Sequence, residues 1–415
     1  MKWESSRLDS LCTAFADGDW IESKDQSDSG IRLIQTGNVG EGDFKGRETK
    51  ARYISEETFK RLRCTEIFAG DCLVSRLPDP VGRSCILPAI GERMITAVDC
   101  TIVRFDQKRM LAKFFCAFTQ SDDYLSAIDR ETSGTTRKRI SRSKLGETQI
   151  PVPPLPEQQR IVTILDQAFA AIATAKANTE KNLANARALF QSHLHAVFER
   201  GDRSGDDPGV GVTTASQGKR DVCRLGDVCE YDRTQGVHRG LPYVGMEHIE
   251  SNTGRFLGSL DPVSVKSNTF RFTSKHVLYG RLRPYLNKVL VPDFDGHCST
   301  EIFPFLPKRS MSREFLRYWL ASDEIVERIN ATCTGARMPR ANMDAVLDFE
   351  IPLPPLPEQQ RIVTCLDQVS SNTRRLETDY QKKLDALDAL KKSLLHQAFT
   401  GQMTSKQADK TLETV

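Results

Sequence analysis

The 415-residue sequence has no cysteine pair and no Cys/His cluster with the spacing of a metal site, although it contains 11 cysteines. An odd number of scattered cysteines is typical of free thiols in a reducing compartment, rather than of disulfides or zinc sites. The sequence also lacks an apolar N-terminal run of signal-peptide length and any run long enough to cross a membrane. These absences favour a cytoplasmic protein that has no membrane partner.

Common enzyme motifs are missing as well. The GKR at 218–220 is not a P-loop, because position 213 holds Thr213 in place of the first glycine and no Ser or Thr follows the lysine. The Pro-Pro pairs at 153–154 and 354–355 follow valine and leucine, whereas the motif of DNA amino-methyltransferases needs an acidic or amide residue there. We therefore expect no catalytic residue, metal ligand or cofactor-binding residue in this chain.

One loose match to a metal-dependent nuclease pattern remains. It combines Asp79 with the DQK at 106–108, and acids in this pattern bind the metal that activates water. Asp79 is wedged between two prolines, and Asp106 follows the end of its strand-like run. The nuclease reading is therefore kept only as an alternative.

The sequence also lacks a strong excess of charge of either sign. The net charge is +3 with a pI of about 8.2, and 39% of the residues are hydrophobic. A protein that coats nucleic acid is strongly basic, so any nucleic-acid surface must be local here. The length is sufficient for two domains with cores of their own.

What the sequence does contain is a long internal repeat. IPVPPLPEQQRIVTILDQ at 150–167 and IPLPPLPEQQRIVTCLDQ at 351–368 differ at two of eighteen positions and lie 201 residues apart. This period is too long for a solenoid unit, so each copy should end a domain-sized module. Because the remainder of the two modules has diverged, the repeat suggests one shared partner and two different targets.

The repeated segments predict two long helices. Prolines up to Pro156 exclude a helix before Glu157 and favour one that begins there. Apolar or small residues then follow the 4-3-4-3 spacing of a heptad seam, which runs through Ile161, Leu165, Ala168, Ile172, Ala175, Thr179, Asn182, Ala186 and Leu189 in the first copy and through Ile362, Leu366, Val369, Thr373, Leu376, Tyr380, Leu387 and Leu390 in the second. We expect two helices of roughly 40 residues, about 60 Å long, that pack against each other in antiparallel directions.

Short strand-like runs and short helical stretches precede each long helix, so we expect an α+β fold with a pseudo-two-fold internal repeat. The strand-like runs are 31–34, 100–105, 289–291 and 302–305, and the helical stretches are 110–118 and 313–330. The expected parts are a first domain at 1–150, a long helix at 151–200, a flexible linker at 201–220, a second domain at 221–350, a second long helix at 351–400 and a polar tail at 401–415.

Traces of the duplication survive inside the diverged domains. The aligned pairs are Arg7 with Arg224, Leu8 with Leu225, Cys12 with Cys229, Arg76 with Arg281, Arg83 with Lys288, Gly134 with Gly335, and Arg139 with Arg340. Both copies thus keep a loop that begins with glycine, carries basic residues and precedes the long helix. We expect these glycines to adopt a positive φ.

Taken together, the doubled PLPEQQRIV segment and the loops IQTGNV, LRPYLNKV and TGARMPR resemble the specificity subunit of Type I restriction-modification systems. The resemblance covers essentially the whole chain. It implies two variable target-recognition domains, each of which reads one half of a bipartite, asymmetric site on double-stranded DNA. It also implies that the long helices set the distance between the half-sites and dock two modification (methyltransferase) subunits, and through them a restriction subunit in the full complex.

Basic and amide residues in the loops are the candidates for DNA contact, because Arg and Lys neutralise phosphates while Arg, Asn and Gln can read base edges. The candidates are Gln35, Asn38, Arg76, Arg83, Thr135, Arg137, Lys138, Arg139, Arg142, His248, Arg281, Arg283, Tyr285, Lys288, Arg337, Arg340 and Asn342. For Gln35, Asn38 and His248, capping of a turn is an equally good interpretation. For the basic runs, the alternative is a solvated charged surface.

The first turns of the long helices are the candidates for partner docking. These residues are Leu155, Gln158, Arg160, Ile161 and Leu165 in the first copy and Leu356, Gln359, Arg361, Ile362 and Leu366 in the second. S-adenosylmethionine, ATP and Mg²⁺ are expected in the partner subunits and not in this chain. Two other interpretations stay open, a chain with nuclease or methyltransferase activity of its own and a coiled-coil adaptor that binds only protein.

Overall fold

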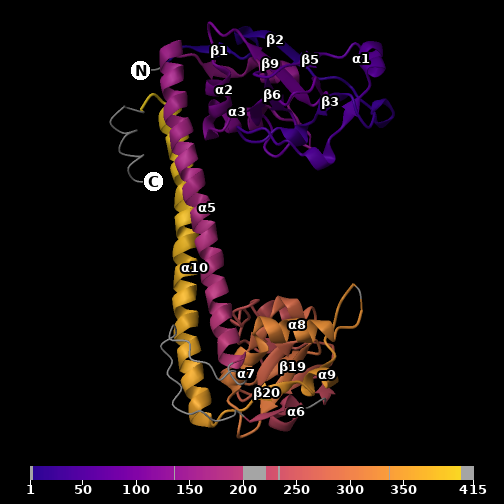
Figure 1. Cartoon of the computed structure of the whole chain (residues 1–415), viewed down its shortest axis with the longest axis vertical. Coiled ribbons are helices and arrows are strands. Elements are labelled where there is room, and N and C mark those ends of the chain that lie inside the picture. Colours follow the sequence, from indigo (N-terminus) through magenta and orange to yellow (C-terminus); the bar gives the residue numbers. More distant parts are fainter. Residues whose placement is uncertain (1–2, 135, 200–220, 232–233, 336, 403–415) are drawn as a thin grey trace. The chain divides into compact units, whose positions relative to one another are not determined.

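The computed structural model describes residues 3–134, 136–199, 221–231, 234–335 and 337–402. Thr135, the expected linker at 201–220 and the tail from 403 onward therefore lie outside the described residues. The chain divides into two units, the first made of Met1–Glu180 with Gln381–Val415 and the second of Lys181–Tyr380. Each unit contains one mixed α+β domain and part of each of the two long helices (Figure 1).

The domain of the first unit is built from two four-stranded sheets. One sheet has the order β2 (Cys12–Asp17), β9 (Cys100–Phe105), β6 (Cys72–Ser75) and β7 (Ser84–Ile86), and the other has the order β4 (Tyr53–Ile54), β3 (Ile31–Ile34), β8 (Met94–Thr96) and β5 (Glu66–Ile67). All neighbours are antiparallel except β3 and β8. The helical segments are η1 (Asp9–Leu11), η2 (Ser23–Asp25), η3 (Thr36–Asn38), η4 (Glu48–Lys50), α1 (Glu56–Leu62), α2 (Ala112–Phe118), α3 (Asp122–Glu131) and α4 (Arg142–Glu147).

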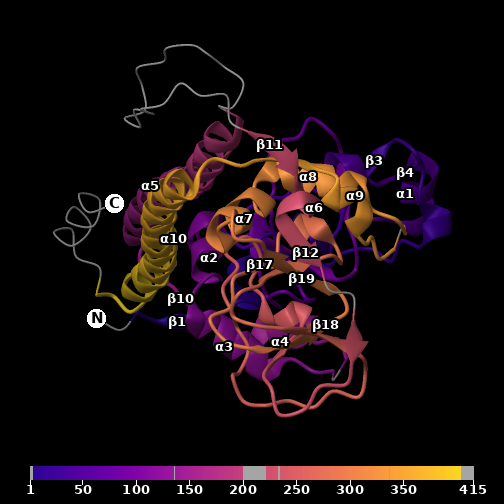
Figure 2. The ribbon, with the colours of Figure 1, turned by 90° about the horizontal axis from the view of Figure 1, so that it is seen from below.

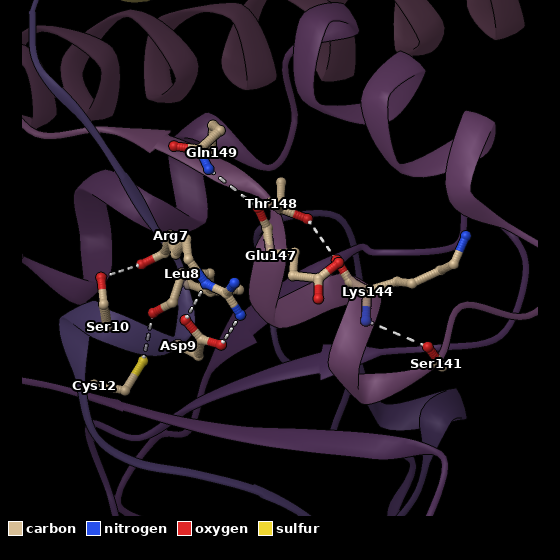
Figure 3. A network of polar contacts seen from close by, with 10 residues as sticks. All are labelled: Arg7, Leu8, Asp9, Ser10, Cys12, Ser141, Lys144, Glu147, Thr148 and Gln149. Atoms are coloured by element: carbon tan, nitrogen blue, oxygen red, sulfur yellow. Dashed lines mark hydrogen bonds and ion pairs between the residues drawn. The ribbon is translucent and has the colours of Figure 1, made fainter.

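A short two-stranded sheet closes this domain. Strand β1 (Ser5–Arg7) pairs with β10 (Gln149–Pro151), and the Leu8 amide donates to the Thr148 carbonyl at 3.0 Å. Figure 3 shows the same region, where Arg7 pairs with Asp9 and the Ser141 hydroxyl caps α4 by accepting from the Lys144 amide. The beginning of the domain is thus fastened to the strand that leads into the long helix.

The domain of the second unit repeats this plan. One sheet has the order β12 (Cys229–Tyr231), β19 (Ile302–Pro307), β16 (Val277–Gly280) and β17 (Val289–Leu290), and the other has the order β13 (Gln235–Gly236), β15 (Thr269–Phe272), β18 (Gly296–Ser299) and β14 (Tyr243–Val244). Strand β11 (Val222–Arg224) pairs with β20 (Glu350–Pro352) and closes the domain. The helical segments are α6 (Leu225–Val228), η5 (Met246–His248), η6 (Pro284–Leu286), α7 (Arg313–Leu320), α8 (Asp323–Ala331) and α9 (Met343–Leu347).

The two domains are therefore copies of one α+β architecture. In both, the first sheet has the same strand order, and the second sheet contains one parallel pair, β3 with β8 or β14 with β18. The second sheets differ at their edges, since β4 pairs with β3 whereas β13 pairs with β15. The pseudo-two-fold repeat expected from the sequence is confirmed at the level of the fold.

The expected long helices are present as α5 (Leu155–Glu199), with 45 residues, and α10 (Leu356–Phe399), with 44 residues. Each begins two residues earlier than expected, so Pro156 is the second residue of α5 and not the residue before it. A proline is tolerated there because the first N–H groups of a helix have no partner inside the helix.

Within each unit the two helices pack in antiparallel directions, and they lie side by side in Figure 1 and Figure 2. Lys176 of α5 pairs with Asp388 of α10 in the first unit. Arg187 of α5 pairs with Glu377 of α10 at 2.7 Å in the second unit. The paired long helices expected from the heptad spacing are thus observed.

The seam itself differs from the expected one over the later part of α5. Leu189 is 57% exposed and Asn182 is exposed, whereas Leu183 and Phe190 are half-buried. In α10, Leu376 is likewise 40% exposed. The expectation was wrong by one position there. The predicted seam goes from Thr179 to Asn182, a step of three residues, whereas the buried and half-buried positions go from Thr179 to Leu183, a step of four.

The end of each long helix packs on a domain through a phenylalanine that recurs at the 201-residue offset, Phe198 and Phe399. Phe399 of α10 contacts Phe114 and Phe118 of α2, with ring centroids 5.3 and 5.1 Å apart. Phe198 of α5 contacts Phe315 of α7 in the same way, at 5.3 Å. Each unit is therefore closed by the C-terminal end of one long helix and the N-terminal turns of the other.

The smaller elements mostly lie where the sequence placed them. The strands at 31–34 and 100–105 have the expected bounds, while the stretch at 313–330 is two helices, α7 and α8, with Ser322 at the N-cap position of α8. No helix in the described part of the chain combines the length and apolarity that crossing a membrane requires.

Candidate nucleic-acid interface

Three loops of each domain carry most of the residues that the sequence selected for DNA contact; Arg142 lies in α4 and Asn342 just before α9. The first follows β3 or β14, the second follows β6 or β16, and the third is the loop that begins with glycine, which we define as the Gly-led loop, 133–139 or 334–340. The structure gives the selected residues very different surroundings, and it separates those that hold the loops from those that face solvent.

Asn38 and His248 cap equivalent turns. The Asn38 side chain accepts a hydrogen bond from the Gln35 amide at 3.0 Å and donates to the carbonyls of Lys45 and Gly46. In the second domain, Nδ1 of His248 accepts from the Gly245 amide at 3.1 Å. Of the two interpretations open for these residues, capping is the role that the structure shows, and Gln35 lies half-buried beside the turn.

Arg83 and Lys288 both donate hydrogen bonds to backbone carbonyls of the neighbouring turn. Arg83 is 8% exposed and donates to the carbonyls of Val39, Leu77, Pro80 and Thr36 at 2.7–3.0 Å. Burial lowers the pKa of its guanidinium from the ordinary value. Lys288 donates to the Met246 carbonyl, which is the equivalent of Thr36, at 2.7 Å. The guanidinium of Arg83 is occupied by backbone carbonyls, so the expectation that it contacts phosphates is corrected. Lys288 is half-buried and makes one such bond, so its contact with phosphate stays a prediction.

Arg76 is also interior. It is 4% exposed, donates to the Val98 carbonyl and lies 3.3 Å from Asp17, while burial lowers its pKa. Its counterpart Arg281 is half-buried over the Phe303 ring. These two arginines support the sheet from which the loops emerge, and the structure does not present Arg76 to a ligand.

The Gly-led loops have one geometry in both copies. Ser133 and Arg139 exchange two backbone hydrogen bonds of 2.9 Å, and Thr334 and Arg340 do so at 3.1 and 3.2 Å. Gly134 and Gly335 have φ values of 102° and 90°, which confirms the expected positive φ.

An acid placed just before the central strand holds the arginine of each Gly-led loop. Arg139 pairs with Asp99 at 3.0 Å, and Arg340 pairs with Glu301 at 2.8 Å. Asp99 precedes β9 and Glu301 precedes β19, so the two acids are structurally equivalent.

Most of the basic run after Gly134 is neutralised within its own domain. Lys138 pairs with Asp129 and Lys144 with Glu131, both at 2.6 Å, and Arg142 lies 4.0 Å from Asp17. Arg137 is exposed and has no acid within ion-pair distance among the described residues. The run that looked most basic in the sequence therefore offers little unpaired charge.

In the second domain, the exposed candidates are Arg283, Tyr285, Arg337 and Asn342. Tyr285 is 55% exposed, and the Arg283 amide donates to the Pro339 carbonyl, which joins the second loop to the Gly-led loop. Asn342 instead caps α9 by accepting from the amides of Asp344 and Ala345. Its counterpart in the first domain is the capping Ser141.

Hydrogen bonds join the three loops of each domain into one surface, which we call the loop rim. In the first domain, the Ile140 amide donates to the Arg76 carbonyl at 3.3 Å, and Arg83 reaches the turn at Thr36. In the second, the Ala341 amide donates to the Arg281 carbonyl at 3.0 Å, and Lys288 reaches Met246. The two rims thus share a scaffold and differ in what they expose.

One basic loop of the first rim is not among the residues predicted from the sequence. Lys45, Arg47, Lys50 and Arg52 are all exposed, and they have no acid within ion-pair distance in the part of the chain that the structure describes. The signal was present, since residues 45–52 contain four cations and one acid.

The expected docking residues divide into buried and exposed groups. Gln158 and Gln359 are fully buried, and each makes three hydrogen bonds of 2.7–2.9 Å to the backbone of its domain. Ile161, Leu165, Ile362 and Leu366 are at most 5% exposed and belong to the cores. These six side chains bind the chain's own domains, so their expected contact with a partner is corrected.

Leu155, Arg160, Leu356 and Arg361 remain at or near the surface, where the arginines pair with Glu157 and Glu358. A second group of repeated side chains is exposed in both copies and was not selected from the sequence. It consists of Gln159, Thr163, Asp166 and Gln167 on α5 and Gln360, Thr364, Asp367 and Gln368 on α10. We call these residues the repeated helix face.

The nuclease alternative finds no common site. Asp79 lines an open hollow of about 850 Å³ together with Asp122, Asp129 and Lys138, and Asp106 is not part of it. Asp106 accepts from the Lys108 amide in its own turn. No group of three or more His, Cys, Asp or Glu side chains that could hold a metal occurs among the described residues.

Comparison with known proteins agrees with this architecture. The specificity subunit of the Type I restriction enzyme EcoDI from Escherichia coli is 29% identical over 40% of this chain and 37% of that protein. The EcoBI specificity subunit, from the same species, is 23% identical over 78% of this chain and 71% of that protein.

Two solved structures share the fold. A chain from a study of complex assembly and conformational transition in the type I R-M system covers 97% of this chain and 98% of its own, with a TM-score of 0.76 and 18% identity. The crystal structure of the HsdS subunit from Thermoanaerobacter tengcongensis covers 97% of both chains, with a TM-score of 0.55 and 19% identity. Residues 1–184 and 219–386 match the family described as Type I restriction modification DNA specificity domain, and the chain belongs to this family.

Proposed function

We propose that this chain is the non-catalytic specificity subunit of a Type I restriction-modification complex. It recognises a bipartite, asymmetric DNA site, docks two modification subunits and, through them, a restriction subunit. S-adenosylmethionine, ATP and Mg²⁺ act in those partners. The observation that carries the proposal is that two domains of one architecture expose different loop rims, while the two long helices expose the same repeated helix face.

The difference between the rims supports two unlike half-sites. The residues that hold the rims are equivalent, as Asn38 and His248 or Asp99 and Glu301 show. The exposed residues are not, because Arg283 and Tyr285 of the second rim have no counterpart of the same type at 78–80. Sequence is read by side chains that reach base edges, so a common scaffold with different exposed residues fits two different half-sites.

The repeated helix face supports one shared partner. Burial accounts for the identity of Gln158, Ile161 and Leu165 in the two copies, since these side chains fill the domain cores. Burial does not account for Gln159 or Thr163, which are exposed like their counterparts Gln360 and Thr364. Two copies of one partner subunit, each on one helix start, would explain why the exposed residues are alike as well.

Single substitutions on this face test the stoichiometry. Thr163→Arg places a long cation on the face of α5, and Thr364→Arg does the same on α10. Each variant, co-expressed with the modification subunit, should bind one partner subunit instead of two, and the double variant should bind none, as measured by native mass spectrometry. Thr174→Arg is the matched control, because Thr174 is also exposed on α5 and its hydroxyl makes the same bond to a carbonyl four residues earlier.

One partner per wild-type chain would contradict the docking proposal.

The DNA proposal is tested by mapping methylated positions in a host genome that expresses the complex. A split motif is expected, and exchange of residues 1–150 for those of a relative should change one half only. Strong crosslinking of S-adenosylmethionine to the isolated chain would instead favour an enzyme, and the absence of duplex binding would favour a protein adaptor.

A further inference from the structure

The basic loop at 45–52 is unlike the other basic segments of the first domain. Its cations Lys45, Arg47, Lys50 and Arg52 are exposed and have no acid within ion-pair distance among the described residues, whereas Lys138 and Lys144 are paired at 2.6 Å. The single acid in the loop, Glu48, lies 3.4 Å from the buried Arg32. The loop therefore presents unneutralised positive charge.

The backbone of the loop is held in place at both ends. Lys45 exchanges hydrogen bonds of 2.8 Å with Asn38, and the Leu33 amide of β3 donates to the Arg52 carbonyl at 2.8 Å. Between them, the short η4 turn is closed by the Lys50 amide, which donates to the Arg47 carbonyl at 2.9 Å.

A buried arginine supports the loop from beneath. Arg32 is 2% exposed and donates to the Gly46 carbonyl at 3.0 Å and to the Tyr53 hydroxyl at 2.9 Å. Since the backbone is already held in place, a ligand that met the four side chains would have to order only the side chains and not the loop itself.

We propose that the loop at 45–52 is a phosphate-binding surface through which the first domain grips the backbone of double-stranded DNA. This inference rests on the proposed function and deepens it. Phosphate contacts set the register of a protein on the duplex and carry no base information themselves. The loop adjoins the turn at 36–38, which Arg83 joins to the rest of the loop rim, so the positive charge is part of that rim.

The second domain shows why the ligand is DNA and not the shared partner. The corresponding segment, between η5 and β15, pairs Arg255 with Glu250 at 2.9 Å and exposes Leu257, Leu260 and Val263. A surface that docked a partner common to both copies would be present in both domains. The basic loop is present in one of the two domains only. We therefore assign it to the function in which the two domains differ, which is contact with their own half-sites.

The experiment measures salt dependence with the full chain and a labelled 30-base-pair duplex of random sequence. The variant is Lys45→Gln/Lys50→Gln/Arg52→Gln, which changes three exposed side chains; Arg47 is retained because its φ is 52°. Each lost phosphate contact makes the negative slope of log K against log salt shallower by about 0.9. The slope should therefore become shallower by about 2 to 3, and the loss of affinity between 50 and 200 mM KCl should be about 40-fold smaller than in the wild type.

The control triple is Lys24→Gln/Lys60→Gln/Lys113→Gln. These lysines are exposed and paired with Glu22, Glu56 and Asp166, so the slope should stay that of the wild type. An unchanged slope in the loop variant overturns the inference and leaves the proposed function intact. Loss of a modification subunit with an unchanged slope overturns it in favour of a protein ligand. No duplex binding by the wild-type chain at low salt overturns the proposed function itself.

Discussion

At the scale of single residues, the sequence located important positions more reliably than it assigned their roles. Gln158, Asn38 and Arg83 were all selected for contact with an external partner, and all three are buried and bonded to the chain's own backbone. A polar side chain that recurs in two copies can face a ligand or satisfy interior carbonyls, and spacing alone does not separate these cases. The pairing of Lys138 and Lys144 with acids on α3 could not be foreseen either, since it depends on tertiary contacts.

Replacement of the buried glutamine tests its structural role. Gln158→Leu would leave the Leu111 amide and the carbonyls of Arg109 and Pro153 without their present partner. Each lost bond to a buried group costs about 1 kcal/mol or more, so the free energy of unfolding should fall by about 3 kcal/mol. The neighbouring Gln159→Leu, at an exposed position, should change it by less than about 0.5 kcal/mol. Equal effects of the two substitutions in urea unfolding would refute the assignment.

The cysteines give a prediction about pH. All 11 are free thiols, and burial raises the pKa of Cys12, Cys100 and Cys229 to about 12 from an ordinary value of 9.0. Above pH 9 the unfolded chain loses thiol protons that the folded chain keeps, so stability is fully present below pH 9 and declines as the pH rises through the window from 9 to 12. A thiol reagent at pH 8 should modify these cysteines far more slowly in the folded chain than in urea.

Cys12→Ala is the matching variant for this test. It removes one of the shifted groups, so its free energy of unfolding should decline less steeply between pH 9 and 10.5 than that of the wild type. A decline as steep as that of the wild type would show that other groups are responsible.

At the scale of elements, periodicity predicted the helices and most of the named strands, and it failed where packing chose between two neighbouring positions. Leu189 fits a strict heptad, yet Phe190 is the residue that packs toward the core of the second unit, with its ring 6.4 Å from that of Tyr318. The helix expected at 313–330 is divided in the same way, since α7 ends at Leu320 and the Ser322 hydroxyl donates to the Trp319 carbonyl before α8 begins at Asp323. Local pattern thus fixes the type of an element better than its phase or its ends.

Two adjacent substitutions in α5 distinguish the observed seam from the expected one. Phe190→Ala removes a half-buried aromatic ring from the core of the second unit and should lower the free energy of unfolding by about 1 to 3 kcal/mol. Leu189→Ala removes a side chain that is 57% exposed and should be nearly neutral, within about 0.5 kcal/mol. If thermal unfolding ranked the two variants in the opposite order, the heptad read from the sequence would be the correct one.

At the scale of the whole molecule, the duplication was the most informative property of the sequence. An eighteen-residue repeat at an offset of 201 residues was enough to predict two modules, two long helices and a shared partner. It could not predict which domain each helix end would cover. The structure shows that pairing in the contacts of Phe198 with α7 and of Phe399 with α2.

The helices also give a prediction about the DNA spacer, which rests on the proposed function. The ion pairs Lys176–Asp388 and Arg187–Glu377 lie eleven residues apart in both helices, so an insertion in one helix alone would misalign the seam on one side. Seven residues inserted after Glu180 and seven after Lys383 keep the heptad phase in both. They lengthen each helix by about 10.5 Å, which corresponds to about three base pairs of duplex. Methylation mapping should therefore show the same two half-sites with a spacer about three base pairs longer, whereas insertion in α5 alone should abolish methylation. If the double insertion assembled and methylated with an unchanged spacer, the distance between half-sites would be set by the modification subunits, and the helices would serve only to dock them.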